Sequence, residues 1–292
     1  MPKNIIALIY DFDKTLSPRS MQNYTALPNL GVEKTGVFWS EVEKESRQEN
    51  AESNLVWMRK LKDLAEDGQK LITKEYFKQC GHNIEYFPGV KGFFAQINRY
   101  VKKASRNRMT VRHYIISAGL KEILEGVSIR KEFYNIFGSE YHYDYSGRPI
   151  WPKVLVTDTI KTQYLFRINK GMENINESIN EHMPEENRPI PFENMIYIGD
   201  GLSDVPAMTL TKKNGGRSIA VYRPYSQKGL KVCKNLLKAN RVDFIAHADY
   251  TKGKELYEYV IATLDLFMKR YDFQMKSVVN RRLLMGSKGK IL

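Results

Sequence analysis

The sequence predicts an α/β protein with a Rossmann-like three-layer sandwich, in which a mostly parallel sheet lies between layers of helices. Short unbroken apolar runs at residues 5–10 and 195–198 are typical of strands that are buried on both faces, and 109–116, which ends in an apolar run, is predicted as another buried strand. Amphipathic helical patterns at 90–101 and 255–268 follow such segments. Because strands alternate with helices, a parallel sheet with right-handed connections is favoured.

A helical block interrupts this alternation. From residue 34 to residue 79 apolar side chains recur at helical spacing, and no strand pattern appears. Thr73 precedes a short helix as a candidate N-cap, and Gly81 is placed to end it. We therefore expect an α/β core formed by residues 1–16 and 89–292, with residues 17–88 inserted as a helical subdomain.

The remaining elements are shorter. Strands are predicted at 154–156, 218–222 and 242–245, and a basic helix at 228–238. Residues 171–191 are rich in Asn, Glu and Pro and have no sustained apolar period, which predicts a surface insertion.

Charge and composition limit the functional classes. The formal net charge of +13 favours anionic partners, but the basic residues are mostly dispersed, as in a solubility feature. Cys80 and Cys233 are too few for a disulfide framework, and we expect both to be buried as small apolar residues. No segment has the roughly 20 apolar residues that span a bilayer, so a cytoplasmic location and no membrane span are expected.

The last stretch, residues 269–290, carries seven basic residues and one acidic residue. It is predicted to be a solvated tail whose end, at 287–290, is disordered. Contact with nucleic acid is disfavoured because the aromatic and basic residues of this stretch do not alternate in a way that supports a stacking platform.

Polar side chains follow three of the predicted strands. These are Asp11 and Asp13, then Ser117 with Gly119, then Asp200 and Asp204. In open α/β sheets ligands bind at the carboxyl ends of the strands, so these loops are expected to converge on one crevice. Clustered carboxylates suit Mg²⁺, and a serine beside a glycine suits phosphate oxygens.

These residues match the haloacid dehalogenase superfamily, and the chain resembles its phosphatases related to phosphoserine phosphatase. Asp11-Phe12-Asp13-Lys14-Thr15 is similar to the first motif of that family, and Ile115-Ile116-Ser117-Ala118-Gly119 to the second. Lys161, at the start of a predicted helix, matches the third. Gly199-Asp200-Gly201-Leu202-Ser203-Asp204 matches the fourth. The helical block falls where many relatives carry a cap over the active site.

The resemblance implies a Mg²⁺-dependent phosphomonoesterase. Asp11 would be the nucleophile that forms an aspartyl-phosphate, and Asp13 would protonate the leaving alkoxide. The side chains of Asp11 and Asp200, with the carbonyl oxygen of Asp13, would hold Mg²⁺. Since halide needs no proton when it leaves, Asp13 argues against dehalogenation.

The resemblance also implies roles for the remaining motif residues. Ser117 and the Gly119 N–H would hold phosphate oxygens. Lys161 would offset the charge of the nucleophile and of the phosphoryl group, and Asp204 would orient Lys161 or a metal-bound water. Lys153 competes for the role of Lys161, because the separation of 39 residues between Lys161 and Asp200 is long.

Two other functions stay open. A phosphotransferase or phosphomutase would use the same motifs, and a non-catalytic binding protein could use the basic surface. The substrate is expected to be a small phosphorylated metabolite, and the oligomeric state is not predicted. In the helical block, Trp39, Arg47, Trp57 and Arg59 fit either a substrate pocket or ordinary packing.

Overall fold

The computed structural model describes residues 3–287, with side chains through residue 283. The strands are β1 (Ile5–Tyr10), β2 (Thr110–Leu120), β3 (Asn135–Tyr143), β4 (Pro149–Val154), β5 (Met195–Gly199), β6 (Arg217–Tyr222) and β7 (Phe244–His247). The α-helices are α1 (Ala26–Asn29), α2 (Thr35–Glu49), α3 (Ser53–Asp67), α4 (Lys74–Cys80), α5 (Val90–Ala104), α6 (Lys121–Leu124), α7 (Ile160–Lys170), α8 (Val205–Lys213), α9 (Gln227–Lys238) and α10 (Glu255–Ser287).

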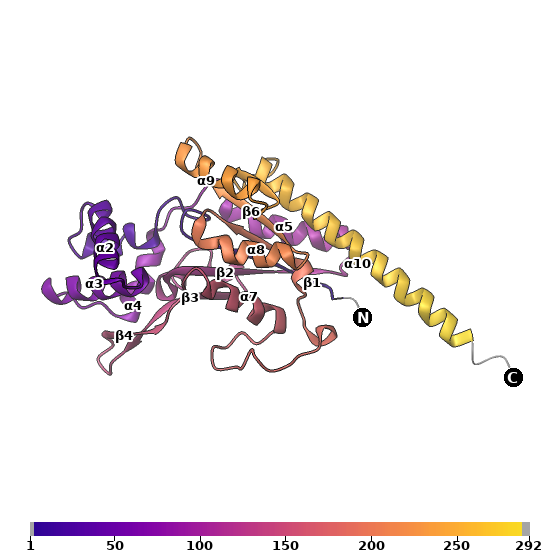
Figure 1. The fold of residues 1–292 in the computed structure, drawn as a ribbon, viewed down its shortest axis with the longest axis horizontal. Coiled ribbons are helices and arrows are strands. Elements are labelled where there is room, and N and C mark those ends of the chain that lie inside the picture. The colour runs from indigo at the N-terminus through magenta and orange to yellow at the C-terminus, as the bar shows by residue number, and fades with distance from the viewer. Residues whose placement is uncertain (1–2, 288–292) are drawn as a thin grey trace.

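One seven-stranded sheet organises the chain, in the order β4-β3-β2-β1-β5-β6-β7 (Figure 1). All neighbouring strands are parallel except β4, which runs antiparallel to β3 at one edge. Without β4, this is the Rossmann strand order. Successive strands are added toward one edge of the sheet from β1 to β3, and toward the other edge from β5 to β7. The predicted Rossmann-like α/β fold is therefore confirmed, and the carboxyl ends of β1 and β5 lie side by side.

Alternating side chains of β1 build two cores, one on each face of the sheet. Ile6, Leu8 and Tyr10 face the layer formed by α5 and α10. Ala7 and Ile9 face the layer formed by α7, α8 and α9. This arrangement explains why β1 is an unbroken apolar run, because both of its faces are covered by helices.

The segment between β1 and α5 is helical, as predicted, and lies at one end of the molecule (Figure 1). Thr73 caps α4 by accepting a hydrogen bond from the Tyr76 N–H at 3.1 Å, and Gly81 follows its last residue. On the α3 side, Met58 accepts a hydrogen bond from the Tyr141 hydroxyl of β3 at 2.6 Å. The helices of this block are thus tied to the sheet by direct hydrogen bonds.

Two predictions were wrong in position. The strand expected at 154–156 lies earlier, as β4, and contains Pro149 and Pro152. Both prolines are tolerated because β4 is an edge strand, whose outer N–H groups have no strand to pair with. The stretch 269–287 is no tail: α10 continues through it, and Arg270 donates to Asn194 at 2.9 Å. Residues 288–290, predicted to be disordered, lie outside the described residues.

Residues 171–191 form the predicted irregular insertion, and one buried arginine organises it. The Arg167 guanidinium donates to the carbonyls of Met172 and Ile175 at 3.1 and 3.0 Å, and also to two further carbonyls of the loop. Lys170 donates to the Glu181 carbonyl at 2.7 Å. These backbone carbonyls of the insertion accept no hydrogen bond from a strand or helix backbone, so the side chains of Arg167 and Lys170 on α7 supply the donors. No helix among the described residues has the length and apolar content to cross a membrane.

Burial lowers the pKa of His113 in β2 to about 3, so this side chain is neutral in the folded protein. Its Nδ1 lies 3.0 Å from the Tyr10 hydroxyl and its Nε2 lies 3.1 Å from Asn98 Oδ1. Because a carbonyl oxygen only accepts, Nε2 carries the proton and Nδ1 accepts from Tyr10.

This neutral histidine predicts a pH dependence of stability. The unfolded state takes up a proton near pH 6.5 and the folded state only near pH 3. The His113 contribution is therefore constant above about pH 6.5 and falls by up to about 1.4 kcal/mol per pH unit below it. Urea unfolding of wild type and His113→Gln from pH 8 to pH 5 measures this effect. The difference between their free energies of unfolding should be constant above about pH 6.5 and should change, to the disadvantage of wild type, below it. The same substitution at the exposed His142 is the control, and an equal shift there would contradict the assignment.

Candidate active site

Asp11 and Asp13 lie directly after β1, at the carboxyl edge of the sheet. The Asp11 N–H donates to the Ile198 carbonyl of β5 at 2.9 Å, which continues the β1–β5 ladder by one residue. The chain then turns, and the Phe12 carbonyl accepts from three successive N–H groups at residues 15–17. Asp13 accepts a hydrogen bond from the Met21 N–H at 2.9 Å. The two carboxylates thus have different partners, although one residue separates them.

Lys161 is the lysine that reaches these carboxylates. It lies near the start of α7, and only 1% of its surface is exposed. Its Nζ donates to Asp11 Oδ1 at 3.0 Å and to Asp204 Oδ1 at 2.7 Å. Lys153, the alternative lysine, instead pairs with Glu140 at 3.2 Å and is half-exposed. The structure therefore brings Lys161 to the cluster and leaves Lys153 outside it.

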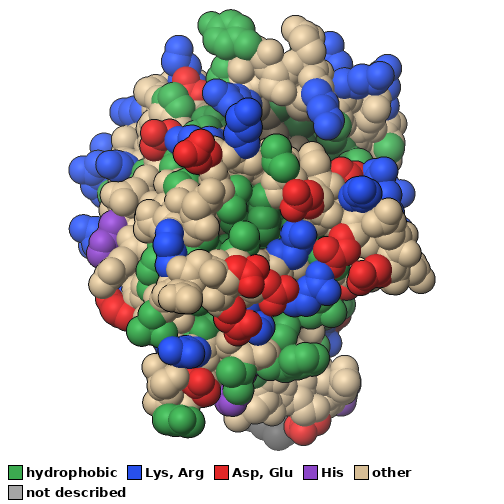
Figure 2. Space-filling view, turned by 90° about the vertical axis from the view of Figure 1, so that its left-hand side faces the viewer, with side chains coloured by type: hydrophobic (Ala, Val, Ile, Leu, Met, Phe, Trp, Pro, Cys, Tyr) green, Lys and Arg blue, Asp and Glu red, His purple; other side chains and the backbone are tan. Residues whose placement is uncertain are grey.

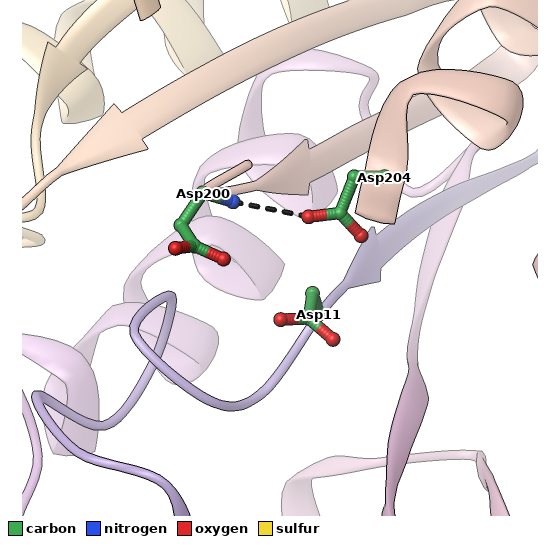
Figure 3. Close-up of side chains that lie close together, drawn as sticks. All are labelled: Asp11, Asp200 and Asp204. Carbon is green, nitrogen blue, oxygen red and sulfur yellow. Dashed lines mark hydrogen bonds between the residues drawn. The ribbon is translucent and has the colours of Figure 1, made fainter. Parts of the chain in front are cut away.

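Asp204 is fully buried, and both of its oxygens accept hydrogen bonds. Oδ1 accepts from Lys161 and from the Tyr197 hydroxyl, the latter at 2.8 Å. Oδ2 accepts from the Asp200 N–H at 3.2 Å, the bond drawn in Figure 3. Gly199 must lack a side chain here, because a Cβ would lie 2.4 Å from Asp204 Oδ2. Asp204 thus positions Lys161 and the loop that carries Asp200.

Ser117 and Gly119 lie at the end of β2, the strand that pairs with β1, and line the same cavity as Asp11. Ser117 is buried, and its Oγ accepts from the Gly119 N–H at 3.1 Å. The pairing of β2 with β3 shifts in register between Ile116 and Leu120, so the strand is irregular at this point. The Met21 side chain packs against Gly119, where a Cβ would lie 2.1 Å from its terminal carbon.

The carboxylates are crowded enough to raise one another's pKa. Burial, with only partial compensation by Lys161, raises the pKa of Asp11 to about 6. Burial and the Asp204 and Asp11 charges raise the pKa of Asp200 to about 8. Burial and the neighbouring Asp11 raise that of Asp13 to about 7. Burial alone would lower the pKa of Lys161, but Asp11 and Asp204 outweigh it and hold that pKa well above its usual range.

These shifts show that one ammonium group does not balance the cluster. Oxygens of Asp11, Asp200 and Asp204 lie within 4.8 Å of one another, and Figure 3 shows the three carboxylates facing a common space. An all-oxygen donor set with excess negative charge fits a hard cation such as Mg²⁺. Because both oxygens of Asp204 already accept hydrogen bonds, Asp11 and Asp200 are the better direct ligands.

A cavity of about 580 Å³ opens over the cluster. Its floor includes Asp11, Asp13, Ser117, Lys161 and Asp200, so the structure brings these predicted site residues together. The helical block forms its other walls.

Three of the four residues singled out in the helical block line this cavity: Trp39, Arg47 and Trp57. Arg59 does not, since it pairs with Glu45 on the outer face of the block. Gln22 also lines the cavity, and we did not predict it. It lies in a loop without helical or strand periodicity, so no sequence pattern marks it.

Comparison with known proteins agrees with the motifs. Residues 8–209 match the family model described as haloacid dehalogenase-like hydrolase. A protein of Borreliella burgdorferi, described as uncharacterized, is 31% identical over 289 residues, covering 90% of this chain and 98% of its own.

Solved structures share the fold. A family hydrolase from Salmonella enterica serovar Typhi superposes with a TM-score of 0.52 at 17% identity, over 78% of this chain and 66% of that one. A phosphoserine phosphatase solved as a phospho-aspartyl intermediate analogue gives 0.53 at 17% identity, over 89% and 99%. A substrate-bound phosphoserine phosphatase gives 0.51 at 16% identity, over 82% and 99%.

Proposed function

The chain belongs to the haloacid dehalogenase-like hydrolase family, and from this premise we propose that it is a Mg²⁺-dependent phosphatase of small phosphomonoesters. The observation that carries the proposal is the pair of carboxylates after β1, with Asp11 held by Lys161 and Asp13 by the Met21 N–H. An alkoxide leaving group needs a proton, whereas a halide does not. A second acid beside the nucleophile therefore supports phosphate ester cleavage over dehalogenation.

In the first step, an oxygen of Asp11 forms a bond to phosphorus while the bond from phosphorus to the substrate's alcohol oxygen breaks. Asp13 gives its proton to that oxygen, so the alcohol leaves neutral. In the second step, water attacks the phosphorus of the aspartyl-phosphate and Asp13 takes up a proton from it. The bond to Asp11 then breaks, and inorganic phosphate and the original Asp11 are restored.

The other site residues act through position and charge. Lys161 lies against Asp11 and offsets negative charge there when the phosphoryl group approaches. Ser117 and the Gly119 N–H are close enough to the cavity floor to bind phosphate oxygens once their mutual hydrogen bond is exchanged. Asp11, Asp200 and the Asp13 carbonyl would hold Mg²⁺, which when bound screens the nucleophile's charge from the phosphate.

We also propose that residues 17–88 are the cap of this enzyme and that 1–16 and 89–292 are its catalytic core. The cavity supports this division, because its floor comes from the strand ends while Trp39, Arg47 and Trp57 come from the helical block. The core then supplies the reaction and the cap the contacts to the alcohol.

Phosphate release with and without metal tests the proposal. Purified protein is incubated with 4-nitrophenyl phosphate and a panel of phosphorylated metabolites, with Mg²⁺ or with excess EDTA and no added acceptor. We expect Mg²⁺-dependent release of inorganic phosphate, and at least about a 10²-fold loss in EDTA that Mg²⁺ restores. Turnover that requires an added acceptor would identify a phosphotransferase instead. No turnover of any ester with Mg²⁺ would contradict the proposal.

A further inference from the structure

Gln22 is a buried amide that has no partner inside the protein. It lies in a short 3-10 turn, Met21–Asn23, and only 2% of its surface is exposed. Its Oε1 is inaccessible and accepts no hydrogen bond, and its side chain makes none with any other described residue. A buried polar group without a partner is costly, so native proteins rarely keep one without a reason. Gln22 lines the same cavity as Asp11 and Asp13, so the alcohol of an ester bound there would be within its reach.

Four of the side chains around the cavity wall are already engaged in hydrogen bonds. The Trp39 indole N–H donates to Asn23 Oδ1 at 2.8 Å, and that of Trp57 to Asn54 Oδ1 at 3.0 Å. Asn54 in turn donates to the Val156 carbonyl at 2.9 Å. The Ser46 hydroxyl donates to the carbonyl of Val42 at 2.8 Å. These bonds hold the wall in place. Ser20, Asn50 and Ser53 also line the cavity without a side-chain hydrogen bond to another described residue, but water can reach them because they are partly or largely exposed. Gln22 differs from them because its unpartnered amide is buried.

The charges that the helical block contributes to the cavity cancel. Among the described lining residues of the block, the charged ones are Glu43 and Arg47, which pair with each other one turn apart on α2. Both side chains are mostly exposed, at 65% and 76%, so the pair lies at the mouth. Figure 2 shows acidic and basic side chains interspersed over this side of the molecule. The block therefore offers no unpaired charge to the substrate's alcohol.

We propose that Gln22 is a specificity-determining residue that selects phosphomonoesters of small neutral alcohols bearing a further hydroxyl group. A hydroxyl both donates and accepts, as a primary amide does, so it can pair with the amide in either orientation. An apolar alcohol would leave the amide unpaired in the complex, and a charged ammonium would find no unpaired carboxylate among the described residues of the helical block that line the cavity. This inference rests on the proposed phosphatase activity.

Matched esters test the proposal. 2-Hydroxyethyl phosphate and n-propyl phosphate have the same number of heavy atoms and differ in one hydroxyl, while 2-aminoethyl phosphate replaces that hydroxyl with an ammonium. For each, kcat/KM is measured with wild type, Gln22→Leu and Gln22→Glu, with Mg²⁺ present. Wild type is expected to favour the hydroxyl ester over the propyl ester by at least about 10-fold, because a site built to hydrogen-bond a hydroxyl rejects an analogue that lacks it.

The variants separate the amide from its surroundings. In Gln22→Leu the ratio of the hydroxyl to the propyl ester should fall to about 1, whatever the absolute rates. In Gln22→Glu the preference should move toward the ammonium ester, because a carboxylate supplies the counter-charge. Gln96→Leu is the matched control: Gln96 on α5 also has an unpartnered oxygen but lies outside the cavity lining, and wild-type ratios are expected. Thermal melting establishes that each variant is folded.

The outcomes distinguish this inference from the function it rests on. If wild type cleaves 4-nitrophenyl phosphate but does not discriminate between the esters, or if Gln22→Leu keeps the wild-type ratio, the role of Gln22 is wrong and the phosphatase stands. If wild type cleaves none of the four esters and none of the metabolites in the panel, the phosphatase proposal is itself overturned. A ratio that collapses in Gln22→Leu and persists in Gln96→Leu supports the selection.

Discussion

Asp11→Asn is expected to lower phosphate release by at least about 10³-fold while the protein stays folded. Asparagine has nearly the shape of aspartate and its oxygen can still accept from Lys161, but an amide does not attack phosphorus. Burial raises the pKa of Asp11 to about 6, so above that pH the negative charge of Asp11 destabilises the folded state. Removing this charge should therefore not lower the melting temperature. Steady-state kinetics at pH 7–8, with thermal melting of the same samples, measures both effects.

Asp67→Asn is a suitable control for this substitution. Asp67 is exposed at the end of α3, so the same chemical change there should leave the rate unchanged. Wild-type phosphate release by Asp11→Asn, from a preparation shown to lack contaminating phosphatase, would rule out Asp11 as the nucleophile.

Lys161→Met is expected to abolish activity and to lower the free energy of unfolding by about 3–5 kcal/mol. Lys161 is buried between Asp11 and Asp204, so removing its ammonium leaves carboxylates crowded without their counter-charge. The pKa of Asp11, which burial already raises to about 6, should then rise further. The stability loss should therefore be full in alkaline solution and diminish as pH falls and the carboxylates take up protons.

Lys153→Met decides between the two candidate lysines. Lys153 pairs with Glu140 while half of its side chain is exposed, so its loss should cost at most about 1 kcal/mol and little activity. Urea unfolding and kinetics on both variants make the comparison. If Lys153→Met were the inactive variant and Lys161→Met the active one, the assignment of Lys161 would be wrong.

The sequence predicted the sheet and the floor of the site because both depend on local patterns. Unbroken apolar runs identify strands buried on both faces, and parallel strands bring their carboxyl ends to one edge. Asp11, Ser117 and Asp200 therefore converge once their strands are recognised. The separation between Lys161 and Asp200 does not prevent this, because Arg167 folds the intervening insertion onto α7.

The remaining features depend on contacts that no local pattern records. The position of β4 differs from the predicted one because proline disfavours a strand unless that strand lies at the edge of a sheet. Which strand lies at the edge is known only from the assembled sheet. The basic charge of residues 269–287 favours a solvated tail, whereas contacts such as that of Arg270 with Asn194 anchor this segment as the end of α10. Gln22 was missed because its significance lies in the absence of a partner among the described residues, which only the packed structure reveals.

The hydrogen bond from the Asp11 N–H to the Ile198 carbonyl has a mechanical consequence. Ile198 is followed by Gly199 and Asp200, so Asp11 and Asp200 follow two adjacent, hydrogen-bonded strands of one sheet. Trp39 and Arg47, by contrast, lie on helices of the inserted block, outside this pair of strands. We therefore expect substitutions at Trp39 or Arg47 to leave the spacing between Asp11 and Asp200 unchanged. In the proposed enzyme, residues of the helical block that contact the alcohol could then change in evolution without disturbing the carboxylates that hold the metal.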